Sequence, residues 1–223
     1  MRGQQWLIVA LVMAISSTAN GAARPIRVTV RVYGVLEDDA ALSTALSHAD
    51  AAMAGVPVFP EWVACTGRAA ASTPRCGAAL PWGELAVRIV DGPRPARRNE
   101  IALGMSIVAR DGSAGALATV YADRVFALAR RSGTDPMLLL GHAIAHELGH
   151  LLMGSTRHAS EGLMRKTWTT SELAGRDPRD WSFAPGDAAV IRRRASREEA
   201  SRQARSLASS PCSPSDACGS DVD

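Results

Sequence analysis

The stretch that decides the fold is residues 134–158, which read Thr-Asp-Pro-Met-Leu-Leu-Leu-Gly-His-Ala-Ile-Ala-His-Glu-Leu-Gly-His-Leu-Leu-Met-Gly-Ser-Thr-Arg-His. A capping side chain followed by Pro136 is typical of a helix start, because proline suits the first turn. Good helix formers fill the following positions, and Gly154 is a natural stop. The sequence therefore predicts one long helix over residues 136–153.

Two histidines of this helix, His146 and His150, stand four residues apart. Residues at this spacing share one helix face, so both imidazoles can reach a single ion, and neutral imidazole nitrogen suits Zn²⁺. Glu147 projects to the same side, a little off the ion. There it can take a proton from an attacking water and pass it to a leaving amine. The pattern His-Glu-x-x-His is a signature of zinc metallopeptidases.

A catalytic zinc site needs a third protein ligand and an open fourth position. Gly154 lets the chain turn sharply out of the helix, and His158 can then return from the loop to complete three histidines. Met164 follows six residues later, where a methionine can form an apolar floor under the ion. His142 lies one turn before His146, but three histidines in one helical row fit a tetrahedral ion poorly. We therefore interpret His142 as a residue of the cleft or the core.

These residues together resemble the metzincin clan of zinc endopeptidases, which combine such a helix with a glycine, a third histidine and a downstream methionine. The resemblance implies a Zn²⁺ ion bound by His146, His150 and His158. It also implies that Glu147 is the general base and that Met164 is the Met-turn residue. The motif pattern is similar to that of a group of small secreted bacterial metzincin-like proteins.

The chain departs from the clan in spacing, since the usual motif is His-Glu-x-x-His-x-x-Gly-x-x-His. One extra residue precedes Gly154 and another separates it from His158, so Thr156, a poor zinc ligand, stands at the usual third position. The resemblance implies a small mixed sheet with an edge strand over the cleft, backed by helices, with the active-site helix after the edge strand. We take Ala118 and Tyr121 as possible edge contacts of a substrate strand, with packing as an equal alternative for Tyr121.

Outward from the helix, the sequence patterns predict a single α/β (α+β) domain. The expected strands are 26–35, 56–64, 85–90, 101–109 and 116–121, and the expected helices are 39–54, 123–131, 136–153 and 187 to about 205. The second strand contains two prolines and is expected to be irregular or at an edge. We expect loops over 66–82, over 91–99 and from 154 to about 184.

Residues 1–23 have the features of a signal peptide: a positive start, an apolar run over 6–15 and small residues at the exit. The run is shorter than the ~20 residues that span a bilayer. We expect cleavage between Ala19 and Ala23, although a buried first helix or an uncleaved anchor stays open. The mature domain is expected over 24–205, with a flexible tail over 206–223. A bacterial protein of this kind is expected to be secreted or periplasmic, without a stable membrane span.

Four cysteines, Cys65, Cys76, Cys212 and Cys218, fit an oxidising compartment, where an even number of thiols usually forms disulfides. We favour pairing Cys65 with Cys76 and Cys212 with Cys218, because each partner is the nearest in sequence, although the other pairings stay open. A cysteine-ligated metal site is disfavoured, since neither pair has the two-to-four-residue spacing of such sites.

Several other residues have simpler interpretations than catalysis. We expect His48 to be structural and Glu161 to be a surface carboxylate, with an oxygen ligand as its alternative. Trp168 and Trp181 are expected to lie in the core or the pocket wall. The arginines of 192–194 are matched by later glutamates and indicate a solvated helix face.

Length and charge narrow the function further. The chain has 223 residues, 47% of them hydrophobic, which suits one domain with a proper core. The net charge is only +3 and Lys166 is the single lysine, so no broad basic face and no nucleic-acid partner are expected. We expect a monomer that hydrolyses peptides or proteins. Two alternatives remain: an inactive zinc-binding or surface-interaction protein, and a cytoplasmic regulator-cleaving metallopeptidase, which the leader and cysteines disfavour.

Overall fold

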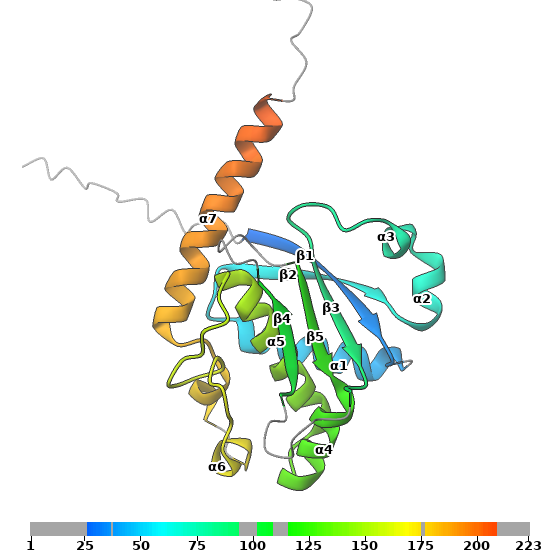
Figure 1. Ribbon diagram of the computed structural model, residues 1–223, viewed down its shortest axis with the longest axis vertical. Helices are drawn as coiled ribbons and strands as arrows, with labels where there is room; N and C mark the ends of the chain where they lie inside the picture. Colours follow the sequence, from blue (N-terminus) through cyan, green and yellow to red (C-terminus); the bar gives the residue numbers. More distant parts are fainter. Residues whose placement is uncertain (1–25, 37, 94–101, 109–115, 175–176, 209–223) are drawn as a thin grey trace, which may run out of the picture.

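The computed structural model describes residues 26–36, 38–93, 102–108, 116–174 and 177–208 (Figure 1). Its elements are β1 (Ile26–Gly34), α1 (Asp39–Met53), β2 (Val58–Cys65), α2 (Gly67–Ser72), α3 (Pro74–Gly77), β3 (Leu85–Val90), β4 (Gly104–Ile107), β5 (Leu117–Tyr121), α4 (Ala122–Ser132), α5 (Pro136–Met153), α6 (Thr170–Ala174), the 3₁₀ helix η1 (Pro178–Trp181) and α7 (Pro185–Ala208). This order of strands and helices confirms the predicted α/β class.

One mixed sheet of five strands carries the domain, in the order β2-β1-β3-β5-β4. Strands β2, β1, β3 and β5 are parallel, whereas β4 runs antiparallel to β5 with Ser106 opposite Ala118. Among the described residues β4 therefore has a partner on one side only. The prediction that Ala118 and Tyr121 lie on the edge strand is wrong, because β5 is hydrogen-bonded to β3 as well as to β4. The sheet has edges at β2 and β4, and among the described residues β4 is the edge strand next to β5.

Helix α5 forms the centre of the core. Its side chains Leu139, Ile144 and Leu148 are at most 1% exposed, since α1, α4 and the sheet surround the helix. Burying a side chain of this size stabilises the fold by about 1.5–3 kcal/mol. Gly141 allows close approach of α1, because a Cβ atom there would lie 2.4 Å from the carbonyl oxygen of Ala45. The position of α5, and of what it carries, is thus fixed from several sides.

Helix α7 is the last element of the described chain. It packs against α5 and β1, and its last turns project beyond the sheet (Figure 1). The helix runs to Ala208, three residues past the end expected from the sequence. No helix among the described residues is both long enough and apolar enough to cross a membrane.

Two segments expected to be loops contain short helices. Residues 66–82 include α2 and α3, and the residues between 154 and 184 include α6 and η1. A disulfide joins Cys65 at the end of β2 to Cys76 in α3, which confirms this pairing. The buried guanidinium of Arg31 bonds Glu84 at 2.7 Å and the carbonyl oxygen of Ala78 at 2.8 Å. These contacts order a stretch whose glycines, alanines and prolines gave no periodic signal.

The expected signal peptide (1–23) and the cysteines of the tail, Cys212 and Cys218, lie outside the described residues. The strand expected over 101–109 is shorter in the structure, where β4 spans Gly104–Ile107.

Candidate metal centre

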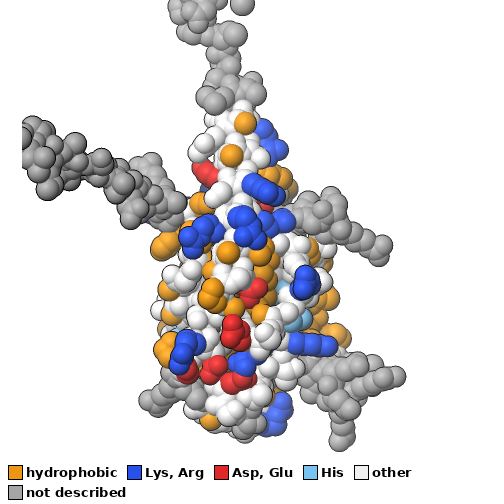
Figure 2. All heavy atoms as spheres, turned by 90° about the vertical axis from the view of Figure 1, so that its left-hand side faces the viewer, with side chains coloured by type: hydrophobic (Ala, Val, Ile, Leu, Met, Phe, Trp, Pro, Cys, Tyr) orange, Lys and Arg blue, Asp and Glu red, His pale blue; other side chains and the backbone are white. Residues whose placement is uncertain are grey.

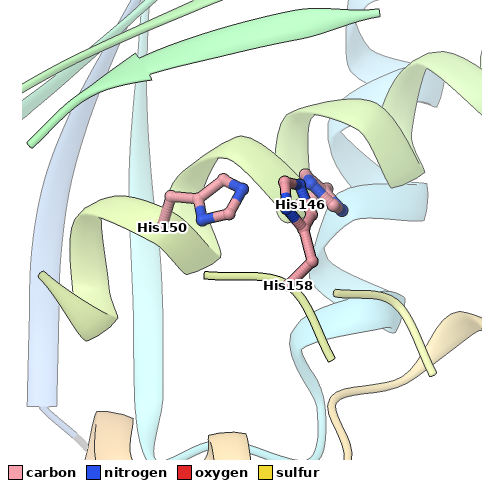
Figure 3. Close-up of side chains that lie close together, drawn as sticks. All are labelled: His146, His150 and His158. Carbon is pink, nitrogen blue, oxygen red and sulfur yellow. The ribbon is translucent and has the colours of Figure 1, made fainter. Parts of the chain in front are cut away.

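The structure brings together the three histidines predicted to be ligands, His146, His150 and His158 (Figure 3). One possible ligand atom from each side chain lies within 4.8 Å of the other two. The ring centroids are 4.9 Å apart for His146 and His150, 4.9 Å for His150 and His158, and 5.4 Å for His146 and His158. Two of these rings come from α5 and the third comes from the loop that follows it.

Local sequence sets both ends of α5. The Asp135 carboxylate caps the first turn by accepting the N–H groups of Met137 and Leu138 at 2.7 and 3.0 Å. At the other end Gly154 adopts a φ of +60°, a left-handed conformation that favours glycine. The helix therefore stops one turn after His150, and the chain can fold back toward it.

The widened spacing does return His158 to the cluster. The neighbouring N–H of Ala159 donates to the carbonyl oxygen of Met164 at 2.9 Å, and Ala159 forms a parallel bridge with Arg165. These contacts hold the loop against the segment around Met164. Thr156, which stands at the usual third ligand position, is exposed.

Hydrogen bonds fix which nitrogen of each helix-borne ring is free. Nδ1 of His146 lies 2.8 Å from the carbonyl oxygen of Leu163, and Nδ1 of His150 lies 2.8 Å from that of Ser155. A carbonyl oxygen only accepts, so each Nδ1 carries the hydrogen and Nε2 keeps its lone pair. Metal-binding histidines typically have such an outer partner. Among the described residues the ring of His158 makes no hydrogen bond.

Burial keeps these rings neutral near pH 7. It lowers the pKa of His146 to about 4, and it lowers the pKa of His150 and of His158. The charge of Lys166 also lowers the pKa of His158. Neutral imidazole is the form that binds a metal, so the donor set fits a divalent cation. His158 is exposed, so the cluster is open on one side. Figure 2 shows one face of the molecule, on which histidine atoms lie at the surface next to basic side chains.

Glu147 is buried beside the histidines and contacts the edge strand. The Ser106 hydroxyl lies 2.6 Å from Oε2 of Glu147 and 2.8 Å from its backbone carbonyl oxygen. Burial raises the pKa of Glu147 to about 7, and the hydrogen bond from Ser106 opposes this shift. A Cβ atom at Gly104 would lie 2.6 Å from Oε1 of Glu147, so β4 passes directly over the carboxylate. Sequence reasoning missed both Gly104 and Ser106, since only the sheet topology places them there.

Met164 lies under α5, fully buried. A Cβ atom at Gly149 would lie 2.5 Å from Sδ of Met164 and 2.7 Å from the Phe183 ring, so glycine makes room for this floor. Met164 therefore packs against α5 at Gly149, the residue that precedes His150. The role of Met164 as the Met-turn residue stays a prediction.

His142 and the tryptophans form an aromatic wall beside the centre. The His142 ring stacks on Trp181 with centroids 4.2 Å apart, and it is not in the metal-ligand group. Burial lowers the pKa of His142 to about 4. Trp168 lies edge-on, 5.9 Å from His146 and 5.2 Å from Trp181. These positions agree with their interpretation as core or pocket-wall residues.

The remaining candidates have other surroundings. Ala118 is fully buried in β5, and the Tyr121 ring lies under the guanidinium of Arg124 at 4.2 Å. Glu161 is exposed and is not in the ligand group. His48 lies in α1, where its Cβ is close to Gly141 of α5, as expected of a structural residue.

No protein-family model matches the chain, and no curated protein matches it in sequence. Among solved structures, the chain is similar to the crystal structure of archaemetzincin from Methanopyrus kandleri. The TM-score is 0.51 at 15% sequence identity, and the match covers 78% of this chain and 99% of that chain. At this identity the likeness concerns the fold, and it confirms the predicted metzincin-like fold.

Proposed function

We propose that this protein is a zinc-dependent peptidase. One observation carries the proposal: three histidines from two segments converge on one point, and a buried glutamate adjoins the first of them. His146, His150 and His158 would hold the ion through ring nitrogens. The metzincin-like fold supports zinc and peptide hydrolysis as the metal and the reaction, in line with the motif on α5.

Different residues of the chain would have different roles in such a reaction. A bound zinc ion supplies a Lewis acid that polarises the scissile carbonyl and makes water nucleophilic near neutral pH. The Leu163 and Ser155 carbonyls orient the rings of His146 and His150. Glu147 accepts a proton from the attacking water while the oxygen of that water bonds to the carbonyl carbon. It then gives the proton to the amine nitrogen as the C–N bond breaks.

The substrate would bind along β4. Met105 and Ile107 are 49% and 54% exposed, and the outer side of β4 has no partner strand among the described residues. An extended peptide can add to such an edge through main-chain hydrogen bonds. This assignment replaces Ala118 and Tyr121 as the substrate edge.

We also propose that the protein is exported by a bacterium as a monomer, with residues 1–23 removed, and works outside the cytoplasm. The disulfide between Cys65 and Cys76 supports this, because such bonds persist in oxidising compartments.

The proposal is tested by measuring zinc content and peptide cleavage together. The chain from residue 24 to residue 223 is expressed in an oxidising compartment, loaded with zinc and incubated with a diverse peptide library that is read by mass spectrometry. We expect one zinc per chain and internal cleavage. A stably folded protein that binds zinc yet cleaves no peptide would contradict the enzyme and favour a zinc-binding or surface-interaction role.

A further inference from the structure

The face of β4 that points toward α5 fits closely against Glu147. Successive residues of a strand face opposite sides, so Gly104 and Ser106 share the face toward α5, whereas Met105 and Ile107 are exposed. The two inner positions hold a glycine and a small hydroxyl, in a strand of only four residues. Both contact the same carboxylate.

Ser106 reaches two oxygens of one residue. Its Oγ lies 2.6 Å from Oε2 of Glu147 and 2.8 Å from the backbone carbonyl oxygen of Glu147, but it has one hydrogen to donate. The shorter distance is that of a hydroxyl donating to an ionised carboxylate, typically about 2.5–2.7 Å. The carbonyl oxygen already has a helical N–H partner four residues on. The hydroxyl therefore donates to Oε2.

Gly104 holds the other oxygen in place by contact. A Cβ atom at this position would lie 2.6 Å from Oε1, 2.7 Å from Cγ and 2.8 Å from Cδ of Glu147, so the end of the side chain rests on the glycine backbone. Among the described residues, Ser106 is the one side chain that hydrogen-bonds to this carboxylate, and no ion pair reaches it. The two oxygens of Glu147 are thus unequal: Oε2 has a donor and Oε1 has none in the described part of the chain.

We propose that Ser106 is a positioning residue, which holds Oε2 of Glu147 and leaves Oε1 as the oxygen that accepts the proton. This inference rests on the proposed peptidase function. It means that the strand that would bind the substrate also orients the general base. Four consecutive residues, Gly104–Ile107, would then set the substrate strand on one side and the base on the other.

The first test reads the position of the base without any catalysis. Crystal structures of the zinc-loaded chain and of its Ser106→Ala variant are compared. Ser106→Ala removes the only side-chain donor described for Oε2, so we expect Glu147 to occupy more than one rotamer or to leave the Gly104 contact. A single Glu147 conformation, identical in both proteins, would overturn the inference even if the protein cleaves no peptide.

The second test separates positioning from binding by kinetics. For Ser106→Ala we expect kcat to fall about 10- to 100-fold, because small misplacements of reacting groups are costly, while KM stays within about threefold. Ser106→Thr keeps the hydroxyl and should recover most of kcat. Full kcat in Ser106→Ala, or equal loss in both variants, would overturn the inference. An inactive wild-type protein would instead refute the peptidase function, and the crystal structures would still decide the role of Ser106.

Thr44 provides the matched control. Its hydroxyl donates to a helical carbonyl oxygen, that of Ala40 in α1, at 2.8 Å, and it is exposed. Thr44→Ala should leave kcat, KM and the Glu147 conformation unchanged. Zinc content and the melting temperature, measured for all variants, show that each protein is folded.

Discussion

The centre has two halves that differ in origin. The helix half consists of His146, Glu147 and His150, which are at most 9% exposed and come from one turn of α5. The outer half consists of Ser106 and His158, with Gly104, from β4 and the loop after α5. The helix half is preorganised by local spacing, whereas the outer half depends on how distant segments pack. The helix half should therefore carry the chemistry, and the outer half should align and complete it.

The largest effect is expected for Glu147→Gln. The amide keeps the size of the side chain but cannot accept the proton, so kcat should fall about 10²- to 10⁴-fold. Because the amide leaves the histidines in place, zinc content should stay at one per chain. Cleavage rates and zinc analysis on the same preparations check this. Full activity in this variant would remove Glu147 from the mechanism.

The two kinds of ligand are compared by His150→Ala and His158→Ala. Structural zinc sites gain about 10–16 kcal/mol from four ligands, so one ligand is worth about 3 kcal/mol, or roughly 100-fold in affinity. We expect at least this loss for His150→Ala, whose ring is held by Ser155, and a smaller loss for the exposed His158. Trp168 lies 5.9 Å from His146, so its fluorescence can follow the titration. Unchanged affinity in His158→Ala would exclude His158 as a ligand.

Acid should destabilise the metal-free protein partly through His142. Its pKa falls from 6.5 when unfolded to about 4 when folded, chiefly by burial and also through His48. The neutral ring thus favours folding above pH 6.5, and this contribution is lost as the pH falls toward 4, by at most about 3 kcal/mol. His142→Phe keeps a ring on Trp181 and should flatten this part of the pH dependence. Denaturant unfolding of both metal-free proteins between pH 7 and pH 4 measures this. The same pH dependence of stability in the wild type and in His142→Phe would contradict the prediction.

The smallest effect is expected for Gly104→Ala, which tests the fit of β4 to Glu147. The added methyl group would overlap the carboxylate, and overpacking of this kind costs about 1–3 kcal/mol. Gly55→Ala is the control, because nothing lies within 4 Å of a Cβ atom there. Denaturant unfolding of both variants measures the difference. Equal stability of the two would show that β4 has room to move.

The helix half was predictable from sequence, and the outer half mostly was not. Spacing of four along a helix is a local rule, so His146 and His150 could be placed without a structure. Ser106 contacts Glu147, which is 41 residues away in the sequence, and the sequence of a short strand does not indicate such a contact. The edge strand was misassigned for a related reason. Strands β4 and β5 both have short apolar patterns, and only the pairing of β5 with β3 shows which one is internal.

His158 was predictable only in part. Its residue type and its place after Gly154 suggested a third ligand, although the spacing is two residues wider than in the metzincin motif. The glycine turn and the pairing of Ala159 with Met164 and Arg165 accommodate the additional residues. Backbone hydrogen bonds of this kind leave no clear sequence pattern, so only the structure shows that the wider loop still reaches the cluster.

A crystal structure of the zinc-loaded chain, with the ion located by anomalous scattering, tests the central claim most directly. We expect one zinc ion at about 2.0–2.1 Å from a nitrogen of each of His146, His150 and His158, with a fourth position open to solvent beside Glu147. An ion bound elsewhere, or held by the two helix-borne histidines with His158 turned away, would contradict the account.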